Sequence, residues 1–214
     1  MNFKTIGLLL LLLSSIKGFS QVNVDVNPEN NWFFGAEIGT NAITTIHPDH
    51  KIYLQGGLLA EYYFAKNWSL SGRIKYFKTG ITDQLKVGER KFEGEVISIP
   101  FNITWYYRFV NIFTGNFKIG VAYNQEVKSE YNYPENERTD YSKFYGNFNP
   151  GFGLNYFVSP KTAIYINYEV FVLGSDKKER GLFDFLSNSA NNNLFNIGIK
   201  HSFSNKDKSS GSKL

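Results

Sequence analysis

The sequence predicts an all-β protein: an eight-stranded antiparallel up-and-down transmembrane β-barrel that follows a cleaved N-terminal signal peptide. This prediction depends on a short apolar leader, on apolar and polar residues that alternate with period two from Trp32 onward, and on connections that alternate between long and short. Alternation with period two is typical of strands that have one apolar face, and no helical period competes with it in this region.

The first 20 residues have the composition of an export signal. Lys4 supplies a positive charge, an apolar run extends from Ile6 to Leu13, and small residues precede Gln21. This run is far shorter than the roughly 20 apolar residues that a spanning helix needs, so we predict cleavage before Gln21. The predicted organisation is a signal peptide over 1–20, a periplasmic segment over 21–31, the barrel over 32–203 and a disordered polar tail over 204–214.

Composition excludes several classes of protein. The 214 residues suit one domain, and their 20 Phe and 14 Tyr favour strands. The absence of cysteine excludes disulfides, thiolate metal sites, a cysteine nucleophile and a lipoprotein anchor. The formal charge of +4 includes two leader lysines, and the sequence contains no basic run, so nucleic acid is not an expected partner.

The first four predicted strands each have a polar and an apolar face. The first two alternate loosely, with Glu37 and Glu61 on the polar face. In the third strand Ile74 lies opposite Lys75, and in the fourth the apolar series from Ile97 lies opposite a polar series that ends at Arg108. The predicted ranges are about 32–40, 53–64, 68–78 and 94–109.

The last four predicted strands follow the same rule. Phe117 alternates with Lys118, Tyr168 with Glu169, and Ile199 with Lys200. Most of the eight segments have at least the roughly 9–11 residues of a tilted membrane strand. The predicted ranges are about 113–124, 144–158, 162–173 and 193–203.

The connections and the aromatic residues indicate which face meets lipid. A soluble ligand-binding barrel has its apolar face inside, whereas a membrane barrel has it outside. Short turns on one side, long polar loops on the other and aromatic residues collected at the turn side are typical of a membrane barrel. The long loops are predicted at 41–52, 79–93, 125–143 and 174–192, and the turns at 65–67, 110–112 and 159–161. The predicted periplasmic girdle comprises Trp32, Trp68, Trp105, Tyr107 and Tyr156.

Three segments resemble a known family. Glu95–Tyr107 is similar to the central strand of the PorT-like group of small outer-membrane β-barrel proteins common in Bacteroidetes-type bacteria, with Thr104-Trp105 where that family commonly has a basic residue. Gly115–Tyr123 and Asn149–Tyr156 resemble the family's following strand and its Gly-rich sixth strand. The resemblance implies an outer-membrane barrel and, for some members, a role in assembling a secretion apparatus. The layout is more distantly similar to the OmpX and OmpA barrels.

The polar face predicts a network of charges in a narrow lumen. An eight-stranded barrel has an interior that side chains fill, and buried charges need partners. We expect Glu61 to lie near enough to Arg73 to pair. A proton or ion path is the alternative reading of the same residues. The predicted network comprises Glu37, Glu61, Arg73, Lys75, Arg108, Lys118, Glu169 and Lys200.

Catalytic, cofactor and metal sites are not predicted. His47, Asp49 and His50 lie on one loop without a fourth ligand. His201-Ser202 is similar to the His and Ser of outer-membrane lipid deacylases, but neighbouring residues of a strand point to opposite faces. We therefore expect a protein that is not an enzyme.

The remaining expectation is a structural or binding role in the outer membrane, with both termini in the periplasm. Its expected partners are outer-membrane lipids, the barrel-assembly machinery and an extracellular or envelope protein bound by the long loops. The apolar residues after Arg180, such as Leu182 and Phe183, lie in one of these loops. A lipid-modifying enzyme, a narrow channel and a soluble periplasmic barrel are the alternatives.

Overall fold

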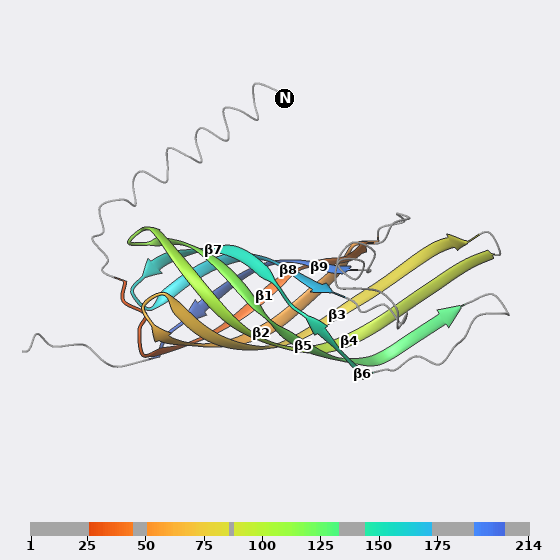
Figure 1. Cartoon of the computed structure of the whole chain (residues 1–214), viewed down its shortest axis with the longest axis horizontal. Coiled ribbons are helices and arrows are strands. Elements are labelled where there is room, and N and C mark those ends of the chain that lie inside the picture. The colour runs from red at the N-terminus through yellow and green to blue at the C-terminus, as the bar shows by residue number, and fades with distance from the viewer. Residues whose placement is uncertain (1–25, 45–50, 86–87, 133–143, 173–190, 204–214) are drawn as a thin grey trace, which may run out of the picture.

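The computed structural model describes residues 26–44, 51–85, 88–132, 144–172 and 191–203 (Figure 1). These residues form nine antiparallel strands in one sheet. No helix in these ranges is long and apolar enough to cross a membrane. The strands are β1 (Asn31–Thr44), β2 (Tyr53–Ala65), β3 (Trp68–Leu85), β4 (Gly88–Val110), β5 (Phe113–Asn132), β6 (Phe144–Phe148), β7 (Gly151–Ser159), β8 (Thr162–Val172) and β9 (Asn191–His201).

The sheet closes into a ring of eight positions, as the sequence predicts. Consecutive strands pair with one another, and β1 pairs with β9 from Phe34 opposite His201 to Thr44 opposite Asn191. Strands β6 and β7 share one position, because both pair with β5 on one side and β8 on the other. The fold is therefore an eight-stranded up-and-down barrel, in which closure leaves no free edge in the barrel wall.

The predicted strand 144–158 is interrupted at Pro150, which has no N–H group to donate to the ladder. The neighbouring backbone groups remain paired across the interruption. The Asn149 N–H donates to the Gly120 carbonyl at 2.8 Å, and the Val170 N–H donates to the Pro150 carbonyl at 3.0 Å. The wall is thus continuous at this point although the strand is divided.

Long loops are predicted at 79–93 and 125–143, and this prediction is wrong for much of both segments. Strands β3 and β4 continue as a hairpin from Thr79 opposite Gly94 to Leu85 opposite Gly88. Strand β5 continues to Asn132, which pairs with Lys91. We call these parts of the three strands, 79–85, 88–94 and 126–132, the hairpin extension; Figure 1 shows it reaching past the rest of the barrel. The predicted loops 41–52 and 174–192 are also shorter, since β1 ends at Thr44 and β9 begins at Asn191.

The loop prediction depended on the polar composition of 79–93 and 125–143. A polar composition does not exclude strands in a segment that lies beyond the barrel wall. The extension reaches past the rest of the barrel, and its residues do not alternate between polar and apolar, although the backbone ladder continues. The β-branched residues Thr79, Ile81 and Thr82 favour the extended conformation there. The signal that remains in the sequence is strand propensity without alternation.

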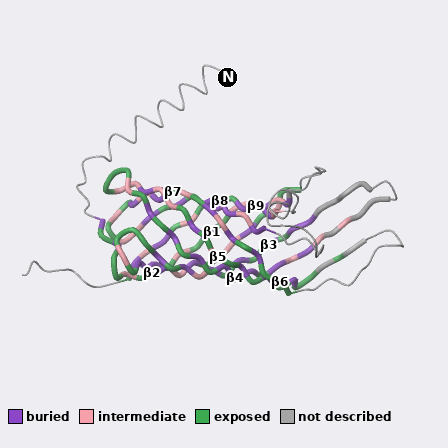
Figure 2. The backbone as a smooth tube through the Cα atoms, in the orientation of Figure 1, coloured by how far each residue is buried: buried purple, intermediate pink, exposed green. Residues whose placement is uncertain are grey.

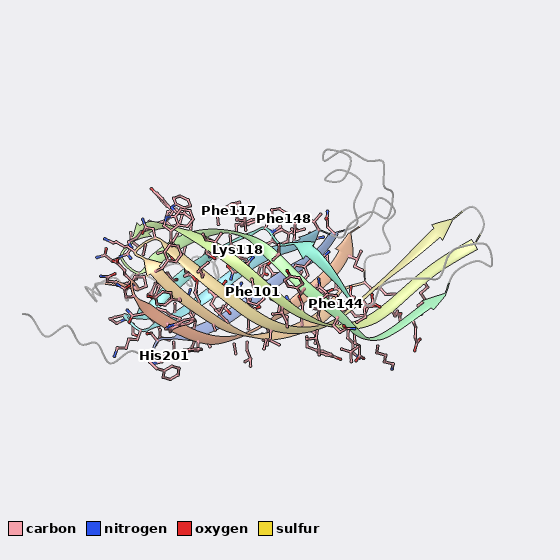
Figure 3. All side chains as sticks on the ribbon, turned by 60° about the horizontal axis from the view of Figure 1, so that its bottom comes forward. Phe101, Phe117, Lys118, Phe144, Phe148 and His201 are labelled. Atoms are coloured by element: carbon pink, nitrogen blue, oxygen red, sulfur yellow. The ribbon has the colours of Figure 1, made fainter. Side chains whose placement is uncertain are left out.

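Along the barrel wall, buried and exposed residues alternate (Figure 2). The exposed face is apolar and the buried face is mostly polar, which is the reverse of a soluble barrel. Phe117 and Lys118 illustrate the rule: the Phe117 side chain lies outside the wall, and the Lys118 side chain lies within it (Figure 3).

Two apolar clusters fill the ends of the lumen. The turn-end cluster consists of Val26, Phe33, Tyr63, Tyr106, Phe157 and Ala163, and the loop-end cluster consists of Phe77, Val96, Ala122, Phe171 and Leu194. Phe33 and Tyr63 meet edge to face with ring centroids 5.3 Å apart. Aromatic pairs in this geometry add to the stabilisation that their buried area gives.

Val26 changes the interpretation of the N-terminal segment. The sequence predicts a plain periplasmic segment over 21–31, but Val26 is fully buried in the turn-end cluster. Asn30 has a left-handed φ of 60°, which asparagine tolerates better than most residues, and its N–H donates to the Tyr63 carbonyl at 2.7 Å. The chain therefore bends into the barrel end before β1 begins. The predicted signal peptide and polar tail lie outside the described residues.

Candidate functional site

The lumen between the two apolar clusters contains a layer of buried charges. We call this layer the charged belt; its side chains come from β1, β2, β3, β5, β8 and β9, and all are buried. Each of these residues occupies an inward position of the period-two pattern. Because the sheet closes into a barrel, inward side chains from six strands meet in one lumen. The members of the charged belt are Glu37, Glu61, Arg73, Lys75, Lys118, Glu169 and Lys200.

Glu169 of β8 contacts two cations of the charged belt. Its Oε1 atom lies 3.1 Å from Lys75 Nζ and 2.8 Å from Lys118 Nζ. The same oxygen accepts a hydrogen bond of 3.0 Å from Asn196 Nδ2. One carboxylate oxygen thus serves two ammonium groups, one from β3 and one from β5.

Glu37 of β1 holds the second part of the belt. It pairs with Lys75 and lies 3.6 Å from Arg73 Nε, and it accepts a hydrogen bond of 2.9 Å from the Tyr165 hydroxyl. Arg73 also donates to Asn102 Oδ1 at 3.1 Å. Because Lys75 contacts both Glu37 and Glu169, these two carboxylates belong to one network.

Glu61 of β2 forms the third part, nearer the turns. It pairs with Lys200 at 2.7 Å and accepts hydrogen bonds from Ser69 at 2.5 Å and from Tyr106. Lys200 Nζ also donates to the Tyr63 hydroxyl at 3.0 Å and lies 5.3 Å from the centroids of the Tyr63 and Tyr106 rings. Cation–π contacts of this kind help to compensate for the desolvation of an ammonium group.

The predicted pair between Glu61 and Arg73 is wrong. In the register of β2 and β3, Glu61 lies opposite Ser71 and Arg73 lies opposite Leu59. Arg73 reaches across to Glu37, and Lys200 enters from β9 to take its place beside Glu61. Both observed pairs therefore join strands that are separated by one strand in the ring, and they prevail over the diagonal contact between the adjacent strands β2 and β3.

Arg108, the eighth predicted residue of the network, lies outside the charged belt. It is half-buried at the turn end of β4. There it lines a cavity of about 10 Å³ together with Pro28, Tyr63 and Thr114. Its position beyond the turn-end cluster separates it from the carboxylates of the belt.

Sequence reasoning missed the uncharged partners in the network. Asn196 contacts Lys75 Nζ at 3.2 Å and also contacts Gln55, and Asn102 donates to Asn149 Oδ1 at 2.9 Å. The signal was present in the sequence, since asparagine recurs on the polar face of strand after strand. Tyr165 could be placed on the polar face but not assigned to Glu37, because that contact joins β1 to β8 over the intervening strand β9, where both residues lie opposite Gly198.

Gly198 is required for the Tyr165 contact with Glu37. A Cβ atom at Gly198 would overlap the Tyr165 ring and would lie 2.7 Å from the Ala36 carbonyl oxygen. We expect Gly198→Ala to lower the free energy of unfolding by about 1–3 kcal/mol, the usual cost of overpacking. Urea unfolding in lipid vesicles measures this. Gly146→Ala is the control, because nothing lies within 4 Å of a Cβ there; equal effects of the two substitutions would contradict the expectation.

The described side chains fill much of the lumen. Between the parts of the charged belt is a cavity of about 10 Å³, which is at the lower limit for one water molecule, roughly 10–15 Å³. The belt lies between the two apolar clusters of buried side chains. An eight-stranded barrel has an interior that side chains fill, and this arrangement can hold the strands in one register.

No metal-binding constellation occurs among the described residues. They contain no group of three His, Asp or Glu side chains placed to hold a metal ion. His201 Nδ1 lies 2.8 Å from the Thr162 hydroxyl, and its ring contacts Phe203 with centroids 4.9 Å apart. These contacts give His201 a structural place at the turn end of the barrel (Figure 3). His47, Asp49 and His50 lie outside the described residues.

The outer wall carries the predicted aromatic girdle on its turn side. Trp32, Trp68, Trp105 and Tyr107 are exposed, and Tyr156 is half-exposed. Trp68 pairs with Trp105 across β3 and β4, and the Trp105 and Tyr107 ring centroids are 6.2 Å apart. A band of exposed apolar side chains continues from the girdle toward the loop side: Ile38, Leu70, Ile74, Ile99, Phe101, Ile103, Ile119, Val121, Leu154, Ile166, Ile197 and Ile199. So extensive an apolar surface is typical of a wall that faces lipid.

The hairpin extension carries polar contacts of its own. Glu93 Oε1 lies 2.9 Å from Lys51 Nζ and 3.2 Å from Lys91 Nζ. Hydrogen bonds from Lys51 and Lys91 hold the pKa of Glu93 below its usual value. All three side chains are largely exposed, so these pairs contribute little to stability.

Comparison with solved structures identifies the same fold. The outer-membrane protein OprG from Pseudomonas aeruginosa is 12% identical, with a TM-score of 0.54 over 85% of this chain and 99% of that chain. Neisserial surface protein A is 10% identical, with a TM-score of 0.52 over 80% and 97% of the two chains. Ail, the attachment invasion locus protein of Yersinia pestis, is 12% identical, with a TM-score of 0.50 over 82% and 99%.

These likenesses establish the eight-stranded barrel of the transmembrane type. No protein-family model and no curated protein matches the sequence. The resemblance to the PorT-like group therefore stays a prediction.

Proposed function

We propose that this chain is an integral outer-membrane protein that conducts nothing and acts through its loop-side surface. The observation that carries the proposal is the filled lumen inside a wall whose exterior is apolar. A lumen closed by paired charges has no room for solute, and the described residues offer no catalytic group. What remains available for function is the wall and the part of the chain beyond it.

The proposed placement follows from the ends of the barrel. The turn side carries the aromatic girdle and the segment at Val26 that precedes β1, which suits a periplasmic side in a barrel with short periplasmic turns. The hairpin extension then lies on the outer side. Export through a signal peptide that is cleaved before Gln21 is part of the same proposal.

The hairpin extension is the proposed binding surface. Among the described residues, 80–85 of β3 and 127–132 of β5 each have a strand neighbour on one side only. Such edges are templates for pairing with an extended segment of another chain. A partner in the envelope or outside the cell fits this geometry, and assembly of a secretion apparatus, as the PorT-like resemblance implies, is the finer form of the proposal.

Conductance tests whether the lumen is closed. We expect purified, detergent-refolded protein in planar lipid bilayers to produce no stable open-channel current at neutral pH, because paired charges and apolar clusters fill the cross-section. A general porin inserted under the same conditions is the positive control. Reproducible single-channel steps from the folded protein would favour the narrow-channel alternative.

A shortened variant tests the binding surface. Replacing residues 81–92 by an Asn-Gly turn should leave a folded barrel, since two-residue turns of this type close hairpins. Folding is checked by the shift in electrophoretic mobility between unheated and heated samples. In a strain that lacks the gene, we expect the full chain to restore the wild-type phenotype and the shortened variant to fail to restore it. A segment of equal length and scrambled sequence is the control for hairpin length, and full restoration by the shortened barrel would overturn this part of the proposal.

A further inference from the structure

The outer part of β5 has one side that no described strand covers. The last residue of β5 that pairs with β6 is Gln125, whereas the ladder with β4 continues to the end of β5. The β4–β5 ladder changes register near the same point, between Glu95 and Val96, and such a bulge bends and twists a strand. We call the side of 127–132 that faces away from β4 the β5 edge. Main-chain groups at an edge of this kind can bind an added strand.

Two rows of side chains cross the hairpin extension and end at the β5 edge. In the first row Lys78, Glu95 and Lys128 lie opposite one another on β3, β4 and β5. Lys78 Nζ lies 3.3 Å from Glu95 Oε1, so this row alternates in charge. In the second row Glu93 lies opposite Glu130. The β5 edge therefore presents a cation and an anion, both exposed, two residues apart on one face of the strand.

The second row contains a repulsion that an added strand can relieve. Like charges directly opposite each other on neighbouring strands destabilise a sheet, and Glu130 has Glu93 as its neighbour. Lys51 and Lys91 both contact Glu93 Oε1, at 2.9 and 3.2 Å. No ion pair joins Glu130 or Lys128 to another described residue. A cation on the far side of Glu130 would offset the repulsion, and an anion on the far side of Lys128 would extend the first row.

We propose that the β5 edge binds an extended segment of another protein that runs antiparallel to β5 and carries Lys or Arg followed two residues later by Asp or Glu. In this direction the cation lies opposite Glu130, the anion opposite Lys128 and the residue between them opposite Ser129. The same segment in the parallel direction would place each charge beside a like charge. Antiparallel ladders are also slightly more stable per residue. The inference rests on the proposed role of the hairpin extension as a binding surface and specifies the chemistry of its partner.

Two other pairings fit the extension less well. The edge of β3, residues 80–85, contains one charged residue, Asp83, and a single charge fixes neither the direction nor the register of an added strand. Two opposite charges fix both, because a slip by one residue turns the side chains to the other face. A second copy of this chain in the same membrane would present its β5 parallel to the first, which is the wrong direction for the charges.

Two peptides test the proposed pattern. Each is labelled with fluorescein, spans 126–132 when centred on Ser129 and consists of Thr and Val around two charges. One carries Lys-Thr-Glu at its centre and the other Glu-Thr-Lys. We expect the detergent-refolded protein to bind the Lys-Thr-Glu peptide about tenfold more tightly, because two cross-strand pairs change from like to opposite charge. Fluorescence anisotropy measures binding, and hydrogen exchange should show that this peptide protects amides of 127–132.

Exchanging the two charges in the protein reverses the expectation. Lys128→Glu combined with Glu130→Lys should make the protein prefer the Glu-Thr-Lys peptide. The control is an exchange of two exposed charges at the turn end, Glu29→Lys combined with Lys66→Glu, which should keep the original preference. Absence of binding, equal binding of the two peptides, or a preference that survives the exchange at the β5 edge would overturn the proposal.

The shortened variant separates this inference from the proposed function. If the peptides fail these tests but the shortened barrel still does not restore the wild-type phenotype, the extension binds a partner of different chemistry. If the shortened barrel restores the phenotype, the binding role of the extension is itself wrong, whatever the peptides do.

Discussion

Glu169→Gln should lower the free energy of unfolding by about 3–5 kcal/mol, the cost of removing one partner from a buried ion pair. Glutamine has nearly the same shape as glutamate, so the substitution removes the charge and leaves the packing in place. Lys75 and Lys118 then face each other in the lumen with Glu37 as the remaining carboxylate of that network. Urea unfolding in lipid vesicles, followed by tryptophan fluorescence, gives the free energy.

Two variants control for this result. Glu95→Gln removes a carboxylate that pairs with Lys78 at 3.3 Å on the exposed surface, and its effect should stay below about 1 kcal/mol. Adding Lys118→Met to Glu169→Gln should recover part of the loss, because the double variant removes a charge of each sign. If Glu169→Gln costs no more than Glu95→Gln, the lumen is hydrated and the belt does not hold the barrel together.

The sequence was sufficient to predict the barrel but not the contacts inside it. Alternation places Glu61, Arg73 and Lys200 on the inner face, since the period-two rule is local. Which cation reaches which carboxylate depends on the register of β9 against β1 and on side-chain reach across the lumen. These are properties of the closed barrel, and no spacing along the chain encodes them. The pairing of Glu61 with Lys200, which are 139 residues apart, shows the difficulty.

The other two differences have separate physical causes. Val26 is buried at the turn end because it packs in the same apolar cluster as Phe33 and Phe157, which a segment outside the strands can reach. No periodicity marks such a residue. The hairpin extension differs from the predicted loops because its residues do not alternate between polar and apolar as those of the wall strands do. Val26 and the extension both lie outside the wall, where period-two alternation carries no information.

The filled lumen and the extension support one interpretation of the molecule. The charged belt and two apolar clusters fix the inner positions of the strands, so the wall can serve as a rigid base. From this base three strands continue beyond the others. The β3–β4 ladder continues in register into the extension, and the β4–β5 ladder resumes there after a bulge between Glu95 and Val96. Because both ladders join the extension to the wall, the unpaired edges of β3 and β5 are held in a defined orientation for a partner.

Ile197→Arg should lower the free energy of unfolding in lipid vesicles by about 2–4 kcal/mol, the cost of a lipid-facing arginine near the middle of a bilayer. Ile197 lies at the centre of β9, is exposed on the outer wall and pairs with Ile38 and Ile166. Its side chain has no neighbour across the wall to clash with, so the cost arises from placing a charge in hydrocarbon. Urea unfolding in vesicles of fixed chain length measures it.

Position along the wall distinguishes this cost from a general effect of arginine. Val158→Arg, at the turn end of β7 and equally exposed, should cost only about 0–1 kcal/mol because the side chain can reach the headgroup region. In a soluble barrel both residues would face water, and both substitutions would be nearly neutral. A neutral Ile197→Arg would therefore contradict the lipid-facing wall itself, whereas a large cost at Ile197 and a small one at Val158 would place the bilayer between the girdle and the extension.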